Sequence, residues 1–216
     1  DSMFEKNIGE SVIVFNNSTT SYNGTALDEA GNEIDAYVTE NAKLSITGTE
    51  FSDNESAEAV ILNSAADFVI DHSSFTGNTG TGFKLSNMSP ATMMDAVISN
   101  TLFNGNTVAG GGSAIHLIGS NGEFETVRIE GNTFLNNTAD MDNSGAVYAN
   151  SFRSLNLANN TFVGNDRAMY LSSSKAFLVN NLLVENGYDF IHAASGSAVY
   201  LTNGNVLGNV TKISAN

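Results

Sequence analysis

The sequence predicts an all-β protein, a right-handed single-stranded parallel β-helix (a solenoid) of about eight coils. Three observations point to this fold class. A Phe-x-x-Asn pattern recurs along the 216 residues of the chain. Apolar residues alternate with polar ones at fixed distances before and after each Phe, as in strands with one buried face. Long runs of helix-forming residues are missing, whereas Gly, Asn and Ser are abundant, which indicates many turns.

The Phe of the pattern marks the origin of each repeat, and the last repeats replace it by Leu or Val. The pairs are Phe4/Asn7, Phe51/Asn54, Phe75/Asn78, Phe103/Asn106, Phe134/Asn137, Phe162/Asn165, Leu183/Asn186 and Val206/Asn209. From Phe51 onward the origins follow one another at intervals of 21 to 31 residues. A unit of this length cannot bury its apolar face alone, so successive units are expected to stack around a continuous core.

A short strand is expected before each origin. Its inward positions lie five and seven residues upstream of the Phe, a spacing of two that fits strand alternation. These positions hold Leu44, Ile46, Phe68, Ile70, Ala96, Ile98, Val127, Ile129, Leu155, Leu157, Ala176, Leu178, Val199 and Leu201.

A second short strand is expected after each Asn. Its apolar pairs are Val60/Leu62, Phe83/Leu85, Ile115/Leu117, Val147/Ala149, Met169/Leu171, Ile191/Ala193 and Ile213/Ala215. Equivalent residues of stacked coils lie about 4.8 Å apart. The Phe residues should therefore form an internal column, and the Asn residues a ladder that satisfies backbone groups of the turns.

Residues 16–43 do not fit the repeat, because Phe4 and Phe51 are 47 residues apart. Either a degenerate coil or a protruding insertion would explain this distance. Segments 86–95 and 118–126 are expected to be loops that lengthen two coils. We expect residues 1–216 to be a single β-helix segment cut from a larger array, since the repeat is already present at Phe4 and no cap is evident.

Composition excludes several function classes. The net charge is −15 with only 8 Lys plus Arg residues, which argues against binding to nucleic acid or to anionic membrane surfaces. The chain has no Cys, so a zinc–thiolate site, a disulfide scaffold and a Cys nucleophile are excluded. No apolar run is long enough for a transmembrane helix. The acidic balance is typical of a protein kept soluble outside the cell or on its surface.

The sequence shows no compact acid/base set, so we expect no catalytic residues, no metal site and no enzyme activity. Asp71 and Glu130 occupy the same position of their repeats, but Ser99 lies between them, which places them about 10 Å apart. His72 follows Asp71, yet neighbours in a strand point to opposite faces, which argues against a dyad. No cofactor is expected, although Ca²⁺ binding by Asp- and Asn-rich turns such as 137–145 stays open.

One column is a candidate contact surface. The position between the two inward residues of the second strand should face outward, and it holds basic and aromatic residues in five consecutive coils. These five residues, called here the contact strip, are Lys84, His116, Tyr148, Tyr170 and His192. Tyr and His offer flat amphipathic surfaces suited to sugars or protein partners. Cross-coil stacking of residues that favour strands is the alternative interpretation.

The pairing of Phe-x-x-Asn with a small-residue step into an apolar strand resembles the repeats of the polymorphic membrane proteins, chlamydial autotransporter adhesins. That family pairs FxxN with GGA followed by Ile, Leu or Val; the matching steps here are GGSAI (111–115), SGAV (144–147) and RAM (167–169). Strict GGA and the cysteines frequent in that family are absent. The resemblance implies a surface-exposed passenger segment that is anchored to the outer membrane through other regions and binds a host-cell protein or glycan. A polysaccharide lyase, hydrolase or tailspike-like depolymerase on the same fold is the alternative.

Overall fold

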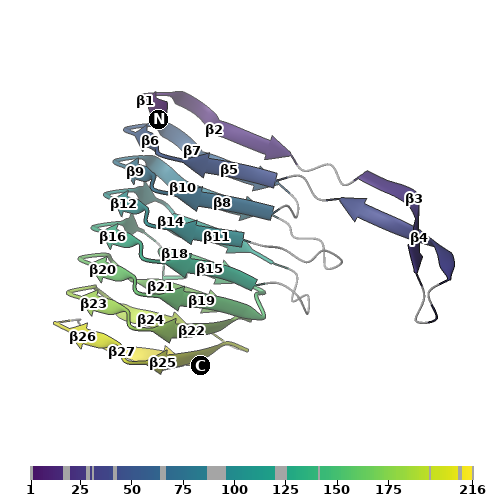
Figure 1. Ribbon diagram of the computed structural model, residues 1–216. Coiled ribbons are helices and arrows are strands. Elements are labelled where there is room, and N and C mark those ends of the chain that lie inside the picture. Colours follow the sequence, from purple (N-terminus) through teal and green to yellow (C-terminus); the bar gives the residue numbers. More distant parts are fainter. Residues whose placement is uncertain are drawn as a thin grey trace.

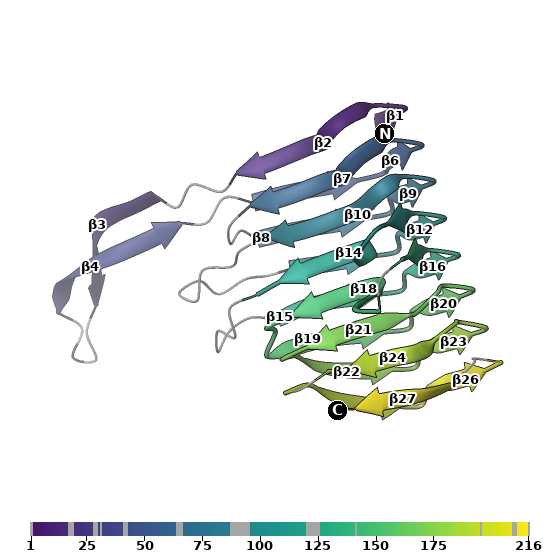
Figure 2. The same ribbon diagram turned by 180° about the vertical axis from the view of Figure 1, so that it is seen from behind.

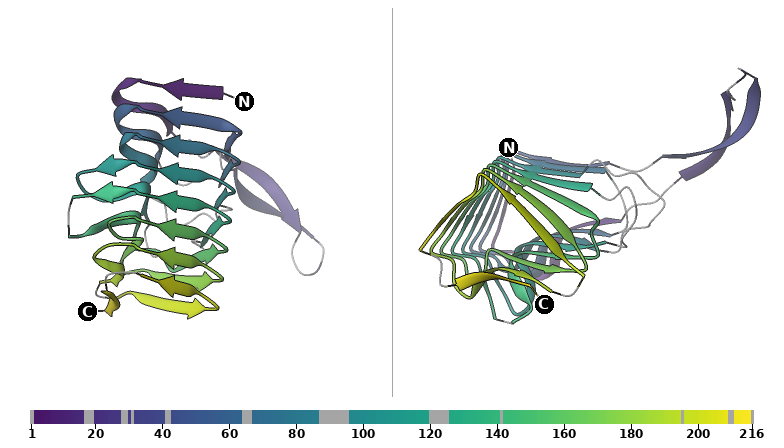
Figure 3. Two further views of the ribbon diagram at one scale, coloured as in Figure 1. Left: turned by 90° about the vertical axis from the view of Figure 1, so that its left-hand side faces the viewer. Right: turned by 90° about the horizontal axis from the view of Figure 1, so that it is seen from below.

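The structure is a computed structural model, in which the described residues form strands, turns and connecting segments without any helix. The described residues are 2–16, 20–27, 30, 32–40, 43–63, 67–86, 96–119, 126–140, 142–194, 196–208 and 211–215. Three parallel sheets run the length of the stack in Figure 1. Viewed along the stack in Figure 3, strands of successive coils lie one behind another on three sides of the interior. This arrangement is a parallel β-helix.

The Phe sheet contains the short strands around each repeat origin, and all of them pair in parallel. Its eight strands are β1 (Ser2–Glu5), β6 (Thr49–Ser52), β9 (Ser74–Thr76), β12 (Leu102–Asn104), β16 (Thr133–Leu135), β20 (Thr161–Val163), β23 (Leu182–Val184) and β26 (Asn205–Leu207). Phe75 pairs with Phe103, and Phe103 pairs with Phe134. Residues at the same position of the repeat therefore lie in register from coil to coil.

The upstream sheet contains the strands that precede each Phe. Its seven strands are β5 (Lys43–Thr47), β8 (Asp67–Asp71), β11 (Ala96–Ser99), β15 (Thr126–Glu130), β19 (Ser154–Ala158), β22 (Lys175–Val179) and β25 (Ala198–Thr202). The predicted inward pairs are buried from Leu44 to Leu178. In β25, Val199 is partly buried and Leu201 is 38% exposed, although both keep the register.

The downstream sheet contains the strands that follow each Asn, and Figure 2 shows most of them one above another. Its ten strands are β2 (Ile8–Asn16), β7 (Glu55–Asn63), β10 (Thr79–Ser86), β13 (Thr107–Val108), β14 (Gly111–Ile118), β17 (Thr138–Ala139), β18 (Ser144–Asn150), β21 (Met169–Ser172), β24 (Asp189–Ala193) and β27 (Thr211–Ala215). Ile213 and Ala215 pair with Ile191 and Ala193, as the repeat predicts.

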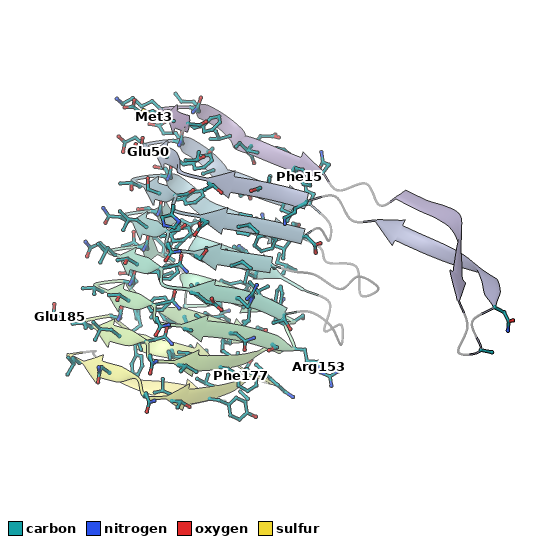
Figure 4. All side chains as sticks on the ribbon, viewed as in Figure 1. Met3, Phe15, Glu50, Arg153, Phe177 and Glu185 are labelled. Atoms are coloured by element: carbon teal, nitrogen blue, oxygen red, sulfur yellow. The ribbon has the colours of Figure 1, made fainter. Side chains whose placement is uncertain are left out.

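The predicted Phe column occupies the interior, which side chains from all three sheets fill (Figure 4). Successive rings from Phe4 to Phe162 stack with centroids 4.4–5.1 Å apart. Leu183 continues the column and is 1% exposed. Val206 keeps the register in the last strand of the sheet but is 40% exposed. The internal column is thus confirmed, with its last member only partly covered.

The predicted Asn ladder is also confirmed. Each side-chain amide from Asn7 to Asn165 donates through Nδ2 to Oδ1 of the Asn in the next coil, at 2.8–3.0 Å. From Asn54 onward, Nδ2 also donates to the carbonyl of the Phe one coil earlier. A buried Asn side chain in this position pairs with backbone groups of the turn. Its own amide oxygen and nitrogen are hydrogen-bonded at the same time. The predicted final member, Asn209, lies outside the described residues.

A corner with positive φ lies on either side of each short strand of the Phe sheet from β6 to β26, and one follows β1; these corners explain why Gly and Asn are abundant. The corner residues before the Phe are Gly48, His72, Asn100, Gly131, Asn159, Asn180 and Asn203. Those after it are Lys6, Asp53, Gly77, Gly105, Asn136, Gly164, Glu185 and Gly208. Gly adopts this left-handed conformation freely and Asn tolerates it, so both residue types suit the corners.

The unusual segment 16–43 contains a hairpin. β3 (Thr20–Leu27) and β4 (Glu33–Glu40) pair antiparallel with each other and with none of the three sheets. The hairpin projects sideways from the stack in Figure 1 and Figure 3. Since β2 before it pairs with β7 and β5 after it pairs with β8, the described part of this segment is a protruding insertion between coil strands. The loops predicted at 86–95 and 118–126 lie outside the described residues, apart from their ends.

Candidate functional site: a groove on the downstream sheet

The five residues of the contact strip are brought together as predicted. Lys84 pairs with His116, His116 with Tyr148, Tyr148 with Tyr170, and Tyr170 with His192. The rings contact one another in sequence, edge-on between His116 and Tyr148 (centroids 4.6 Å apart) and stacked from Tyr148 through Tyr170 to His192 (5.5 and 5.0 Å). Both the contact interpretation and the cross-coil stacking interpretation require this alignment.

Exposure along the strip differs from the expectation. Tyr170 is only 7% exposed, and its hydroxyl donates to Asn143 Oδ1 at 3.1 Å. Tyr170 lies on the outer face of its strand as predicted, between the inward Met169 and Leu171, but the segment around Asn143 covers it. The other four strip residues are half-buried. Burial and the neighbouring Tyr170 raise the pKa of the Tyr148 hydroxyl.

Arg167 fixes the covering segment. Its side chain is 6% exposed and donates from Nη1 to the carbonyl oxygens of Asp142 and Ser144, the latter at 2.7 Å. The guanidinium also lies 5.8 Å from the centre of the Tyr170 ring and 5.5 Å from that of Tyr188, in cation–π range. The Arg167 guanidinium therefore binds backbone carbonyl oxygens within segment 137–145, the turn in which Ca²⁺ binding was left open. In the part of the chain that the structure describes, no three acidic or His side chains cluster as a metal site.

A groove lies at the other end of the strip, where β7 and β10 begin. Its volume is about 580 Å³, and its walls come from β2, β7, β10, β14 and the segment 107–110. The residues that line it are Gly9, Glu55, Ser56, Ala57, Glu58, Thr79, Gly80, Thr81, Lys84, Thr107, Val108, Ala109, Gly110 and His116. This volume falls within the range of about 300–1,000 Å³ that is usual for small-molecule sites. Lys84 and His116 are the strip residues that reach it.

Local backbone irregularities create the groove. The register between β10 and β7 shifts between Thr79 and Thr81, and Gly80 has φ +131°. A Cβ at Gly80 would lie 1.8 Å from the Ser56 carbonyl oxygen, so only glycine permits this close approach. Next to the lining residue Gly110, Gly111 has φ +86°, and a Cβ there would lie 2.5 Å from Nδ1 of His116. The chain thus packs directly against the imidazole.

An ion pair lies within the groove, between Glu58 and Lys84. Lys84 Nζ is 2.6 Å from Glu58 Oε1, and Ser11 Oγ donates to Glu58 Oε2 at 2.9 Å. The carboxylate and the ammonium are 12% and 25% exposed. Glu58 is not among the residues that the sequence pattern predicts for a site, although its position carries a signal: simple alternation from Val60 would point Glu58 into the core. A charge at such a position indicates a register shift.

Three polar side chains of the groove have hydrogen-bonding capacity that no described residue uses. The Thr81 hydroxyl is in a side chain only 3% exposed, and no hydrogen bond to a described residue satisfies it. Within the same residues, neither ring nitrogen of His116 has a partner, and Lys84 donates only to Glu58. Burial, followed by the charge of Lys84, lowers the pKa of His116 to about 4, while Glu58 partly opposes this. His116 is therefore neutral at pH 7, with one donor and one acceptor nitrogen.

A second polar cluster surrounds Asp71. Ser99 pairs with both Asp71 and Glu130, so these carboxylates lie two coils apart as predicted. The alternation argument used against an Asp71–His72 dyad does not apply, since the two side chains are in contact: His72 Nδ1 is 2.6 Å from Asp71 Oδ2. The cause is the positive φ of His72 (46°), which ends the strand alternation.

The Asp71 cluster does not form a nucleophile–base pair. Ser99 Oγ and Asn100 Nδ2 donate to Asp71 Oδ1 at 2.7 and 3.0 Å, so the hydroxyl bonds the carboxylate rather than the imidazole. These bonds, that of Ser99 first and then those of His72 and Asn100, lower the pKa of Asp71 to about 2. Asp71 therefore stays ionised near neutral pH. The side chains around this corner are hydrogen-bonded to one another, which gives the cluster a structural role.

Comparisons with known proteins agree with this architecture. No curated protein and no solved structure gave a match. Among the described residues, no helix is long and apolar enough to cross a membrane. A family model described as the right-handed beta helix region matches residues 1–162, three quarters of the chain. The predicted fold class is confirmed, and the chain belongs to the right-handed β-helix family.

Proposed function

We propose that the chain is a non-enzymatic binding segment of a cell-surface adhesin, in which the β-helix presents the groove at β7 and β10 to a glycan or protein partner. The observation that carries this proposal is the set of polar groups in the groove, on Thr81, Lys84 and His116, that no described residue satisfies. Buried polar groups cost free energy unless a ligand or water pairs with them. A site that needs such partners is suited to binding.

The architecture supports display by a rigid body. Eight coils at a strand spacing of about 4.8 Å give a rod of roughly 40 Å. The Phe column and the Asn ladder connect each coil to the next, so the groove is held on a continuous scaffold. The resemblance to autotransporter passengers supports an extracellular location, with anchoring to the outer membrane through regions outside this chain and a host-cell partner.

A polysaccharide-active enzyme is the second candidate function, and one observation favours it. Glu58 and Lys84 form the compact carboxylate-plus-base cluster that the sequence analysis did not find. The two groups contact each other at 2.6 Å, however, and Glu58 also accepts from Ser11 Oγ, so each is engaged within the protein rather than aimed at a substrate. We therefore favour binding without turnover.

Blocking the groove tests the proposed function. Ala109 is exposed at the wall of the groove, so Ala109→Phe should fill it without entering the core. Ala158→Phe, on the outer side of β19, is the matched control. We expect Ala109→Phe to weaken binding to host cells or immobilised glycans about tenfold or more, a loss of roughly 1.4 kcal/mol, while the control binds as the parent does.

Equal binding by parent, variant and control would contradict the proposal. Polysaccharide digestion assays address the second candidate. Release of products that Glu58→Gln abolishes would replace binding by catalysis as the function of the groove.

A further inference from the structure

We propose that the groove binds an uncharged, hydroxyl-rich ligand, a short neutral oligosaccharide, rather than an acidic glycan or a peptide. This inference rests on the proposed function and specifies the ligand class of the same site. Three features of the groove carry it: its charge, the donors and acceptors it offers, and the pairing of the strands around it.

The charge of the groove disfavours acidic ligands. Its ionised groups are the carboxylates of Glu55 and Glu58 and the ammonium of Lys84, so it carries one net negative charge with His116 neutral. Lys84, its cation, already contacts Glu58 at 2.6 Å. An acidic sugar would have to displace Glu58 from that contact and would meet Glu55 as well. The net charge of −15 on the whole chain adds to this repulsion.

The unsatisfied groups match hydroxyls. Thr81 can both donate and accept, neutral His116 offers one donor and one acceptor, and Lys84 retains two N–H donors that no described residue accepts. Sugar hydroxyls also donate and accept, so one ligand can pair with all three side chains. Neighbouring wall positions hold small residues, Ala57, Gly80 and Ala109, which leave room for the face of a sugar ring.

The strands around the groove disfavour a peptide that binds by strand addition, which needs an unpaired strand edge. β7 pairs with β2 on one side and β10 on the other. β10 pairs in turn with β7 and with β13 and β14. Among the described strands that line the groove, β2 keeps an unpaired edge, since β7 is its one partner. Strand addition at β7 and β10 is therefore disfavoured, and recognition there uses side chains with hydroxyl, imidazole and ammonium groups.

The experiment measures binding of the whole chain to defined oligosaccharides by isothermal titration calorimetry. Neutral probes are cellohexaose, laminarihexaose, mannohexaose and maltohexaose; acidic probes are hexagalacturonate and a heparin hexasaccharide. Thr81→Val removes the buried hydroxyl and keeps the side-chain shape, and Thr76→Val in β9 is the matched control outside the groove. We expect at least one neutral probe to bind, with affinity reduced about tenfold or more by Thr81→Val and unchanged by Thr76→Val. Thermal melting of both variants confirms that they fold.

The other outcomes separate failure of the inference from failure of the proposed function. Binding of an acidic probe in preference to all neutral ones would overturn the inference and leave the groove as a binding site. If no oligosaccharide binds while Ala109→Phe still reduces binding to host cells, the partner is a protein and the inference is wrong. Failure of Ala109→Phe to affect binding to any partner would overturn the proposed function as well.

Discussion

Replacing Asn137 by Ala tests the physical basis of the fold most sharply, because this side chain makes four hydrogen bonds at mid-stack. Its Oδ1 accepts from the backbone N–H and from Nδ2 of Asn106, at 3.1 and 3.0 Å. Its Nδ2 donates to the Phe103 carbonyl and to Asn165 Oδ1, at 3.0 and 2.9 Å. Asn137 is 1% exposed, so water cannot replace these partners without local opening.

The expected loss follows from the groups left without partners. Asn137→Ala leaves two buried N–H donors of Asn106 without a partner and removes one donor from the Phe103 carbonyl, whereas Asn165 Oδ1 keeps the backbone N–H of residue 137. Each buried donor left without a partner costs about 1–3 kcal/mol. Even at the low end of this range the two Asn106 donors should lower the free energy of unfolding by about 2 kcal/mol, a large part of the roughly 5–15 kcal/mol typical of a folded domain.

Urea denaturation followed by far-ultraviolet circular dichroism measures the loss. Asn104→Ala is the control, because Asn104 lies on the outer side of β12 and should cost less than about 0.5 kcal/mol. A loss below about 1 kcal/mol for Asn137→Ala, or a loss equal to that of the control, would refute the role given to the ladder.

Three further changes test other parts of the account. Phe134→Ala removes a fully buried ring stacked on both sides and should cost about 3–5 kcal/mol in urea denaturation; a loss under about 1 kcal/mol would argue against burial. His116 has a folded-state pKa near 4 against 6.5 ordinarily, so the unfolded chain binds its proton more readily and stability should fall as pH drops from 6.5 to 4, by up to about 3 kcal/mol. His116→Gln should lose less stability over that pH range, and an unchanged pH profile would contradict the burial of the imidazole. Arg167→Met should free the segment over Tyr170 and increase proteolytic cleavage near Asn143; cleavage at the parent rate would show that Arg167 does not hold it.

The sequence was sufficient to predict the columns of the β-helix, because residues at one position of a repeat must occupy one place in the coil. The Phe stack, the Asn ladder and the inward pairs of both strands follow from this rule. A second ladder, in which Asn132 donates to Asn160 and Asn160 to Asn181, was missed. Its signal was present all the same, since each of these residues stands two before its repeat origin.

The groove could not be predicted from the repeat, because departures from the repeat create it. Alternation assigns Glu58 to the core, and only the register shift at Gly80 turns it toward Lys84. The same reasoning explains the Asp71–His72 contact, since a corner with positive φ breaks the alternation that argued against it. The cover over Tyr170 comes from the segment around Asn143, which connects β17 and β18 in the preceding coil. The places where polar side chains come together are therefore set by irregularities of the backbone, which the repeat pattern does not show.

The central claim is that the groove at β7 and β10 binds a ligand. Mapping ligand contacts by nuclear magnetic resonance tests this claim most directly. Isotope-labelled protein would be titrated with the neutral oligosaccharide that binds best, and backbone amide shifts recorded for the whole chain. The account predicts the largest shift changes at the amides of Thr81, Lys84 and His116. It predicts no change at the amides of Phe177 and Tyr200, whose exposed rings stack on the upstream sheet. Changes confined to Phe177 and Tyr200, with the groove residues unaffected, would contradict it.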